Sequence, residues 1–188
     1  MHRRLFLTAA RDLVLGGAVW TALPQAQAQP RYTVSAAQLQ QGVGQRFPLR
    51  YPVAGLLNID VQAPQLSLLS AQNRLGAEMA VEAAGPALHR SYAGVFDVDF
   101  ALRYEASDRT FRAHQLRFKR LHFPALPAAA SELLNTYGAA LADQSLQEVV
   151  LHQLSPQDLA LPDGLGLQPG SITVTDKGLE IGFVTKPL

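Results

Sequence analysis

The sequence contains no cysteine among its 188 residues. Disulfides, thiolate metal sites and a cysteine nucleophile are therefore excluded, and so is anchoring through a lipid-modified N-terminal cysteine. Charged residues are few, at 16%, and the formal net charge is only +1. So small a net charge gives no reason to expect a nucleic-acid or strongly acidic partner.

Catalytic and metal-binding motifs are also missing. None of the histidines has the i, i+4 spacing of a helical metal pair, and no HExxH occurs. Asp97 and Asp99 share a strand face and, with His114 on the next strand, could bind a metal or exchange protons. The simpler interpretation is a solvated outer face. We therefore expect no enzyme, no catalytic residue, no metal and no cofactor.

The first 28 residues have the features of an export signal. Arg3 and Arg4 precede an apolar run over residues 13–23, and Ala26-Gln27-Ala28 supplies the small residues of a cleavage site. The run is shorter than the roughly 20 residues that span a bilayer, although an uncleaved anchor is the alternative. Residues 3–7 resemble the twin-arginine export motif. We expect residues 1–28 to be cleaved and the rest to reach the periplasm.

The remaining stretch, residues 29–188, is predicted to be a single globular domain. Nearly half of the sequence, 48%, is hydrophobic, which is typical of a folded chain. The longest helix is expected over residues 124–145. One face of this helix is predicted to carry an apolar stripe formed by Leu126, Ala130, Leu133, Leu134, Tyr137 and Leu141. A sheet is needed to cover that stripe.

A shorter helix is expected near the start of the domain. Ser35 and Gln38 form a capping box, and Leu39 and Val43 lie on one face after it. Apolar alternation predicts strands over residues 57–63, 75–83, 94–104 and 111–123, and a terminal hairpin over residues 172–183. Residues 146–154 fit a strand or a continuing helix. Residues 155–161 are expected to form a loop or single turn, and residues 162–169 a Pro/Gly-rich connection.

Two interruptions of the alternation predict irregular strand geometry. The apolar phase switches at Pro64, which indicates a bulge or an edge position. A second irregularity predicts a bulge near residues 113–115. In the strand over residues 94–104, Phe96, Phe100 and Leu102 are expected inside, and Asp97, Asp99 and Arg103 are expected in water. The whole pattern predicts an α+β fold with one antiparallel sheet folded over the long helix.

Two parts of the predicted fold could carry function, one on the surface and one in the interior. Arg112, Arg117, Lys119 and Arg120 form a basic cluster that could touch anionic lipid headgroups transiently, or could simply face water. The second part is the interior. Its apolar side chains either fill the core or leave part of it open for an apolar ligand, and periodicity does not separate these alternatives.

Several short motifs carry a family resemblance. They are Ser35-x-x-Gln38-Leu39 with Phe47-Pro48, Ala63-Pro64-x-Leu66-x-Leu68 with Asn73-Arg74-Leu75, Leu133-Leu134-Asn135, and Leu167-Gln168-Pro169-Gly170-Ser171-Ile172. From Tyr32 to Leu188 the chain resembles the YceB-like family of bacterial envelope proteins. That family is similar in fold to the tubular lipid-binding (TULIP) superfamily, in which a strongly curved antiparallel sheet wraps one long helix around an apolar tube.

The resemblance implies binding of a lipid or another apolar small molecule, with transfer as an extension, and no catalysis. Anchoring in the manner of the family's lipoproteins would need a cysteine that this chain lacks. From the alternation, the expected lining residues are Leu39, Val43, Leu66, Leu68, Met79, Val81, Phe96, Phe100, Leu102, Leu133, Leu134, Tyr137 and Leu141. The competing hypotheses are an envelope structural or interaction protein with a filled core, whose protein partner is unknown, and a hydrolase with an unrecognised site.

Overall fold

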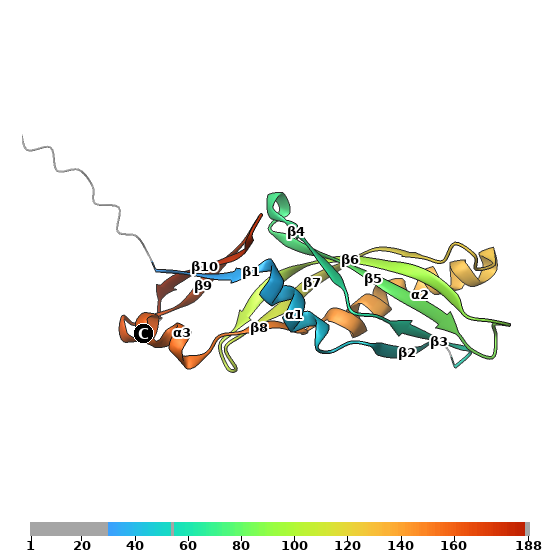
Figure 1. The fold of residues 1–188 in the computed structure, drawn as a ribbon, viewed down its shortest axis with the longest axis horizontal. Helices are drawn as coiled ribbons and strands as arrows, with labels where there is room; N and C mark the ends of the chain where they lie inside the picture. The colour runs from blue at the N-terminus through green and yellow to red at the C-terminus, as the bar shows by residue number, and fades with distance from the viewer. Residues whose placement is uncertain (1–29, 54, 187–188) are drawn as a thin grey trace, which may run out of the picture.

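The computed structural model of the protein describes residues 30–53 and 55–186. The expected signal segment and its cleavage site lie outside the described residues. In chain order the elements are β1 (Arg31–Ser35), α1 (Ala36–Gly44), β2 (Leu49–Val53), β3 (Leu57–Val61), β4 (Gln65–Leu69), the 3-10 turn η1 (Ser70–Gln72), β5 (Arg74–Ala84), β6 (Tyr92–Glu105), β7 (Thr110–His122), α2 (Ala128–Leu146), β8 (Val150–Gln153), α3 (Pro156–Gly164), β9 (Leu167–Thr175) and β10 (Gly178–Thr185). The fold is elongated, with α2 towards one end and α3 at the other (Figure 1).

The large sheet has the order β2-β3-β5-β6-β7-β8, and all of its pairs are antiparallel. Along β5, Leu75, Met79 and Val81 are buried while Glu78 and Glu82 are exposed. This is the alternation of a strand with one face against a core. The expected α+β class with a curved antiparallel sheet and few helices is confirmed.

The interruption at Pro64 is a bulge. β3 and β4 both pair with the same edge of β5, one after the other along its length. Val61 at the end of β3 lies opposite Val81, and Gln65 at the start of β4 lies opposite Glu78. The chain therefore advances four residues while β5 advances three, and the extra residue exchanges the inward and outward faces. The expectation from the sequence is confirmed.

Two bulges in β7 explain its irregular phase. One lies between the pairs Asp99–Arg117 and Ala101–His114, where Gln115 has φ 49°. The other leaves Lys119 as the extra residue between the partners of Asp97 and Val98. After each extra residue, the side chains that point inward are the alternate set, displaced by one position along the sequence. The bulge expected at residues 113–115 is confirmed, and the second one was not predicted.

The two helices close the concave face of the large sheet in succession. α2 contacts β7 and also β2, which is the opposite edge strand. α1 likewise contacts β8 and β4, which lie on opposite sides of the sheet. A flat sheet could not bring strands from its two sides to one helix, so these contacts show that the sheet curls around α2 and then α1. The capping box of α1 is confirmed, with Gln38 N–H donating to Ser35 Oγ.

The expectation of a single sheet was wrong. A separate three-stranded sheet has the order β1-β10-β9, in which Tyr32 lies opposite Ile181. β1 has only five residues before α1 begins, too few to stand out as a strand in the sequence. Asn73 links the two sheets, since its Nδ2 donates to Ile172 O at 3.0 Å and its Oδ1 accepts from Val174 N at 2.7 Å. Its side-chain amide thus bonds β9 as a strand neighbour would.

The region after α2 also differs from expectation. The ambiguous stretch is a strand, β8, after α2 ends at Leu146. The expected loop and Pro/Gly-rich connection were wrong at residues 156–164, which form α3. Ser155 and Asp158 make a capping box and Pro156 opens the first turn, so the helix starts well despite Pro162 inside it. Burial of Leu159 and Pro162 compensates for the hydrogen bond that Pro162 removes.

Gly42 sets the distance between α1 and β8. A Cβ at this position would overlap the carbonyl oxygen of Leu151, whereas a Cβ on Gly44 would meet nothing within 4 Å. The helix backbone therefore lies directly against the strand backbone at Gly42. A larger side chain there would have to push α1 away from β8.

We expect Gly42→Ala to lower the free energy of unfolding, although alanine is the better helix former by about 1 kcal/mol. The clash is with backbone atoms, which cannot rotate away as a flexible side chain would. Gly44→Ala is the matched control and should leave stability unchanged or slightly raised. Urea denaturation of both variants measures the difference. A Gly42→Ala variant as stable as Gly44→Ala would show that α1 does not pack on β8 in this way.

Candidate functional site

Most residues expected to line a ligand site meet in one interior, between the large sheet and the two helices. Their exposed fractions are 3% or less for Leu39, Val43, Met79, Val81, Phe96, Phe100, Leu134 and Leu141. Leu66, Leu68 and Leu102 are partly buried and pack against this core. The structure thus gathers these apolar side chains as the alternation predicts. In the described state they pack against one another, so a ligand could reach them only if a helix moved.

Two members of the predicted set need separate mention. The side chain of Leu133 lies outside what the structure describes. Tyr137, expected inside, is 37% exposed, so this expectation was wrong. The reason is Gly138, which approaches β7 so closely that a Cβ on it would lie 2.5 Å from the ring of Phe118. This approach turns the next residue back along α2, Tyr137, towards solvent.

The two sides of α2 are held differently. On the β7 side, Gly138 sits against Phe118. On the β2 side, the hydroxyl of Tyr51 donates to the backbone carbonyl of Gln144 at 3.3 Å. Burial raises the pKa of Tyr51, so the hydroxyl keeps its proton for this bond at neutral pH. We call this contact between α2 and β2 the seam.

The ends of α2 add little to its stability. Pro127 at the N-cap makes no side-chain hydrogen bond, the first turn has no acidic residue, and the last turn has no basic residue. Capping and favourable dipole charges each stabilise a helix by up to about 1–2 kcal/mol, so their absence makes α2 depend on its packing.

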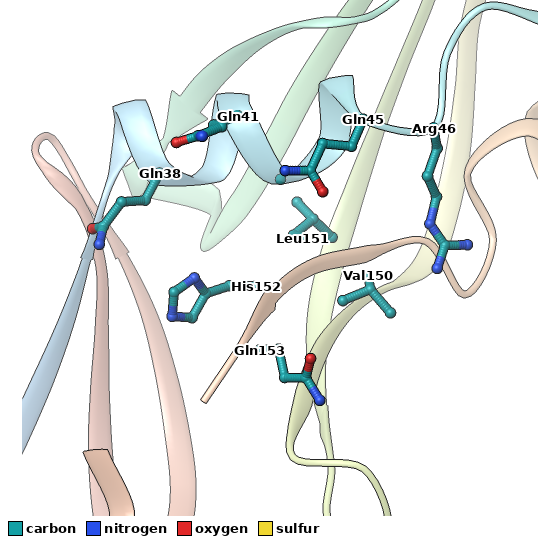
Figure 2. A pocket seen from close by; sticks show the side chains of 9 residues that line it. Gln38, Gln41, Gln45, Arg46, Val150, Leu151, His152 and Gln153 are labelled. Carbon is teal, nitrogen blue, oxygen red and sulfur yellow. The ribbon is translucent and has the colours of Figure 1, made fainter. Parts of the chain in front are cut away.

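A second candidate site is an open hollow of about 410 Å³ between α1 and β8. Figure 2 shows Gln38 and Gln41 of α1, with Gln45 and Arg46 just after it, on one side, and residues 150–153 of β8 on the other. The lining residues bring amide, guanidinium and imidazole groups but no carboxylate or hydroxyl. They can donate hydrogen bonds to a polar ligand, but they do not include a nucleophile paired with a base. This hollow was not predicted from the sequence.

His152 is the titratable group of the hollow. Its Nε2 lies 3.3 Å from the hydroxyl of Tyr32, and its ring stacks on Phe111 at a centroid distance of 6.5 Å. Burial lowers the pKa of His152, and the charge of Asp158 opposes that shift only in part. The ring is therefore neutral at physiological pH. It joins β8 to β1 and so connects the two sheets.

The carboxylates considered as a metal or acid–base site are ion-paired. Asp99 was expected in water, which was wrong: it is 1% exposed and bonded to Arg74. Lys119 Nζ lies 2.9 Å from Asp99 Oδ2, and Arg120 lies 2.6 Å from Asp97. Burial raises the pKa of Asp99, but hydrogen bonds from Lys119 and Arg74 outweigh it, and the pKa ends below its ordinary value. The carboxylate is thus a fixed anion.

His114 is not part of this group, because it lies opposite Ala101 on β6. In the described part of the chain, no three His, Asp or Glu residues come together as a metal site would require. Arg74 was missed as a structural residue. The only signal was a charged residue placed directly before the first apolar residues of the strand.

The basic cluster on β7 is largely neutralised. Arg120 pairs with Asp97, Lys119 with Asp99, and Arg112 with Asp108, with a further contact to Glu148 at 3.7 Å. These pairs favour the interpretation that this strand face meets water. Separately, none of the helices over residues 30–53 and 55–186 combines the length and the apolar character that crossing a membrane requires.

Comparison with known proteins gives a distant likeness to solved structures. No family model matches the chain, and no curated protein matches it significantly. Among solved structures, the chain is similar to a crystal structure of lipopolysaccharide binding protein, with 13% sequence identity and a TM-score of 0.34. The match covers 89% of this chain and 46% of that one, so this chain spans about half the length of that protein. So distant a likeness assigns neither a ligand nor a family to this chain.

Proposed function

We propose that the protein binds a lipid or another apolar small molecule between the curved sheet and α2, and that it acts by binding and not by catalysis. The observation that carries the proposal is the closure of the sheet by α2, which contacts both β7 and the opposite edge strand β2. A helix in this position covers an apolar interior that runs along the sheet. Displacing it would expose a continuous apolar surface.

The ligand enters by opening the seam. The Tyr51–Gln144 hydrogen bond contributes about 1 kcal/mol, as a single neutral hydrogen bond does. The β7 side is held by close packing of Gly138 on Phe118. We therefore expect α2 to swing about its β7 contact. An apolar ligand compensates for the lost packing, because burying its surface contributes about 25 cal/mol per Å².

A reversible lock on the seam tests this mechanism. The chain has no cysteine, so Tyr51→Cys with Gln144→Cys creates a unique pair that a short crosslinker with two thiol-alkylating groups and a cleavable spacer can join. We expect the locked, delipidated protein to take up a fluorescent fatty acid much more slowly than the same variant after cleavage of the linker. Stopped-flow fluorescence measures the uptake rate.

The matched control is Arg50→Cys with Asp60→Cys, which crosslinks the neighbouring strands β2 and β3 without spanning the seam. This lock should leave uptake unchanged. Equal uptake by the locked and cleaved seam variants would contradict entry beneath α2.

The proposed setting is the periplasm. It rests on the export signal over residues 1–28, which stays a prediction because that segment lies outside the described residues. The motif resemblance to the YceB-like family supports the same setting. Without an N-terminal cysteine to acylate, we propose a freely diffusing form that can carry a ligand between membranes.

A second candidate function is a structural or interaction protein of the cell envelope. Full burial of Met79, Phe96, Phe100 and Leu134 favours it, since a filled interior needs no ligand. The two candidates differ in a simple observable. Only the first predicts that the delipidated, folded protein binds the fluorescent fatty acid.

A further inference from the structure

The end of the large sheet furthest from α3 is built from apolar and basic side chains. Three connections meet there: the turn between β2 and β3, the loop between β5 and β6, and the loop between β7 and α2. The register places them together, with Asn58 opposite Ala84, Ala83 opposite Tyr92 and Val95 opposite His122. Figure 1 shows these connections at the right-hand end of the molecule, and we call them the loop end.

The loop end contains no carboxylate. Residues 55–57, 85–92 and 123–127 include no Asp or Glu, whereas His89 and Arg90 are present and exposed. The nearest acidic side chain on β3, Asp60, is neutralised by Arg50, with Nε–Oδ1 2.6 Å and Nη2–Oδ2 2.9 Å. Glu82 on β5 and Glu132 on α2 lie outside these loops. The exposed charge of the loop end is therefore basic.

An apolar path runs from this surface to the interior. Leu56 is 51% exposed, while Leu88 and Tyr92 are partly buried and pack against the core. The guanidinium of Arg90 lies over the ring of Tyr92 at 5.1 Å, which places a positive charge at the rim of the apolar patch. Ala87 N–H donates to Leu56 O at 3.2 Å, so two of the loops are joined.

We propose that the loop end docks onto the anionic surface of a lipid bilayer. Leu56 enters the boundary between headgroups and acyl chains, and Arg90 faces the lipid phosphates. Apolar side chains beside basic ones are the combination that binds such surfaces. The inference rests on the proposed function, because docking here places the interior beneath α2 next to the source of its ligand.

The opposite end is a natural comparison. Leu161 of α3 and Leu165 just after it are more exposed than Leu56, at 68% and 60%. However, Asp163 lies between them in sequence and pairs with Lys186 at 2.9 Å, and Asp158 caps the same helix. This end has apolar side chains without an excess of basic charge. Charge complementarity therefore selects the loop end.

The test places a single tryptophan at a chosen site and follows its fluorescence. The only tryptophan is Trp20, so in the full chain Trp20→Phe with Leu56→Trp gives one reporter at the loop end. Trp20→Phe with Leu161→Trp gives the matched reporter on α3. With phosphatidylglycerol vesicles we expect the Leu56→Trp emission to move to shorter wavelength and to be quenched by brominated acyl chains. Phosphatidylcholine vesicles should give little change, and the Leu161→Trp emission should not respond to either.

A charge reversal measures the electrostatic part. Each unit of charge near an anionic surface changes binding roughly fivefold, so Arg90→Glu should weaken vesicle binding about thirtyfold. Arg117→Glu, an exposed arginine on β7, is the control and should change binding far less. A silent Leu56→Trp reporter, a response at Leu161→Trp instead, or equal losses for the two arginine variants would each overturn the inference. These outcomes are read without the fatty-acid probe, so they are distinct from a failure of ligand binding.

Discussion

Replacing Arg74 with methionine should lower the free energy of unfolding by roughly 3–5 kcal/mol, because it leaves the buried Asp99 carboxylate without its buried partner. Arg74 is 5% exposed and Asp99 is 1% exposed. The guanidinium also donates to Asp99 O at 3.1 Å and to Gln115 O at 2.6 Å, so it holds the bulge of β7 in place. Lys119 remains as a partner and favours the lower part of the range.

The pH dependence of this variant separates a lost charge partner from lost packing. In the wild type, the lowered pKa of Asp99 contributes stability above its unfolded pKa of about 3.9, and the contribution is lost as pH falls through the folded value. In Arg74→Met, the carboxyl is easier to protonate than in the wild type. The stability deficit should therefore shrink as pH is lowered from neutral, which urea denaturation at several pH values measures.

The double variant Arg74→Met with Asp99→Leu is the control. Removing both charges should restore part of the stability that Arg74→Met loses, because no unpaired charge stays buried. A deficit of Arg74→Met below about 1 kcal/mol, or one that does not change with pH, would contradict the buried ion pair.

Phe100→Ala should cost about 3–5 kcal/mol, the range for removing a fully buried aromatic ring. Phe100 has no exposed surface and lies opposite Leu75 within the core. Arg103→Ala on the outer face of the same strand is the control. The Arg103 side chain is 36% exposed, so its ion pairs are weak and the Arg103→Ala substitution should cost at most about 1 kcal/mol. Comparable losses for the two variants would mean that β6 does not present these faces as described.

Regular elements could be predicted from the sequence because local rules suffice for them. β5 follows from strict alternation, and α1 follows from a capping box with Leu39 and Val43 one turn apart. Even the bulges at Pro64 and in β7 leave a trace, since an extra residue changes the apolar phase. The site residues follow the same rule, because an inward-facing apolar position is visible in the alternation.

What the sequence did not reveal depends on distant partners. β1 becomes a strand only through β10, which lies at the other end of the chain. Asp99 is buried because Arg74 reaches it, although alternation alone places it in water. Tyr137 is exposed because one glycine fixes the rotation of α2. The hollow beside His152 likewise needs α1 and β8 side by side, and nothing local indicates that contact.

The most direct test of the central claim is a titration of the delipidated, folded wild-type protein with the fluorescent fatty acid. We expect saturable binding with one molecule per chain, and displacement by unlabelled lipid. Binding should also slow amide hydrogen exchange in α2 and at the seam, and it should leave the ion pair of Arg74 and Asp99 unchanged. Folded protein that shows no saturable binding would contradict the ligand-binding account and leave the filled core as the functional state.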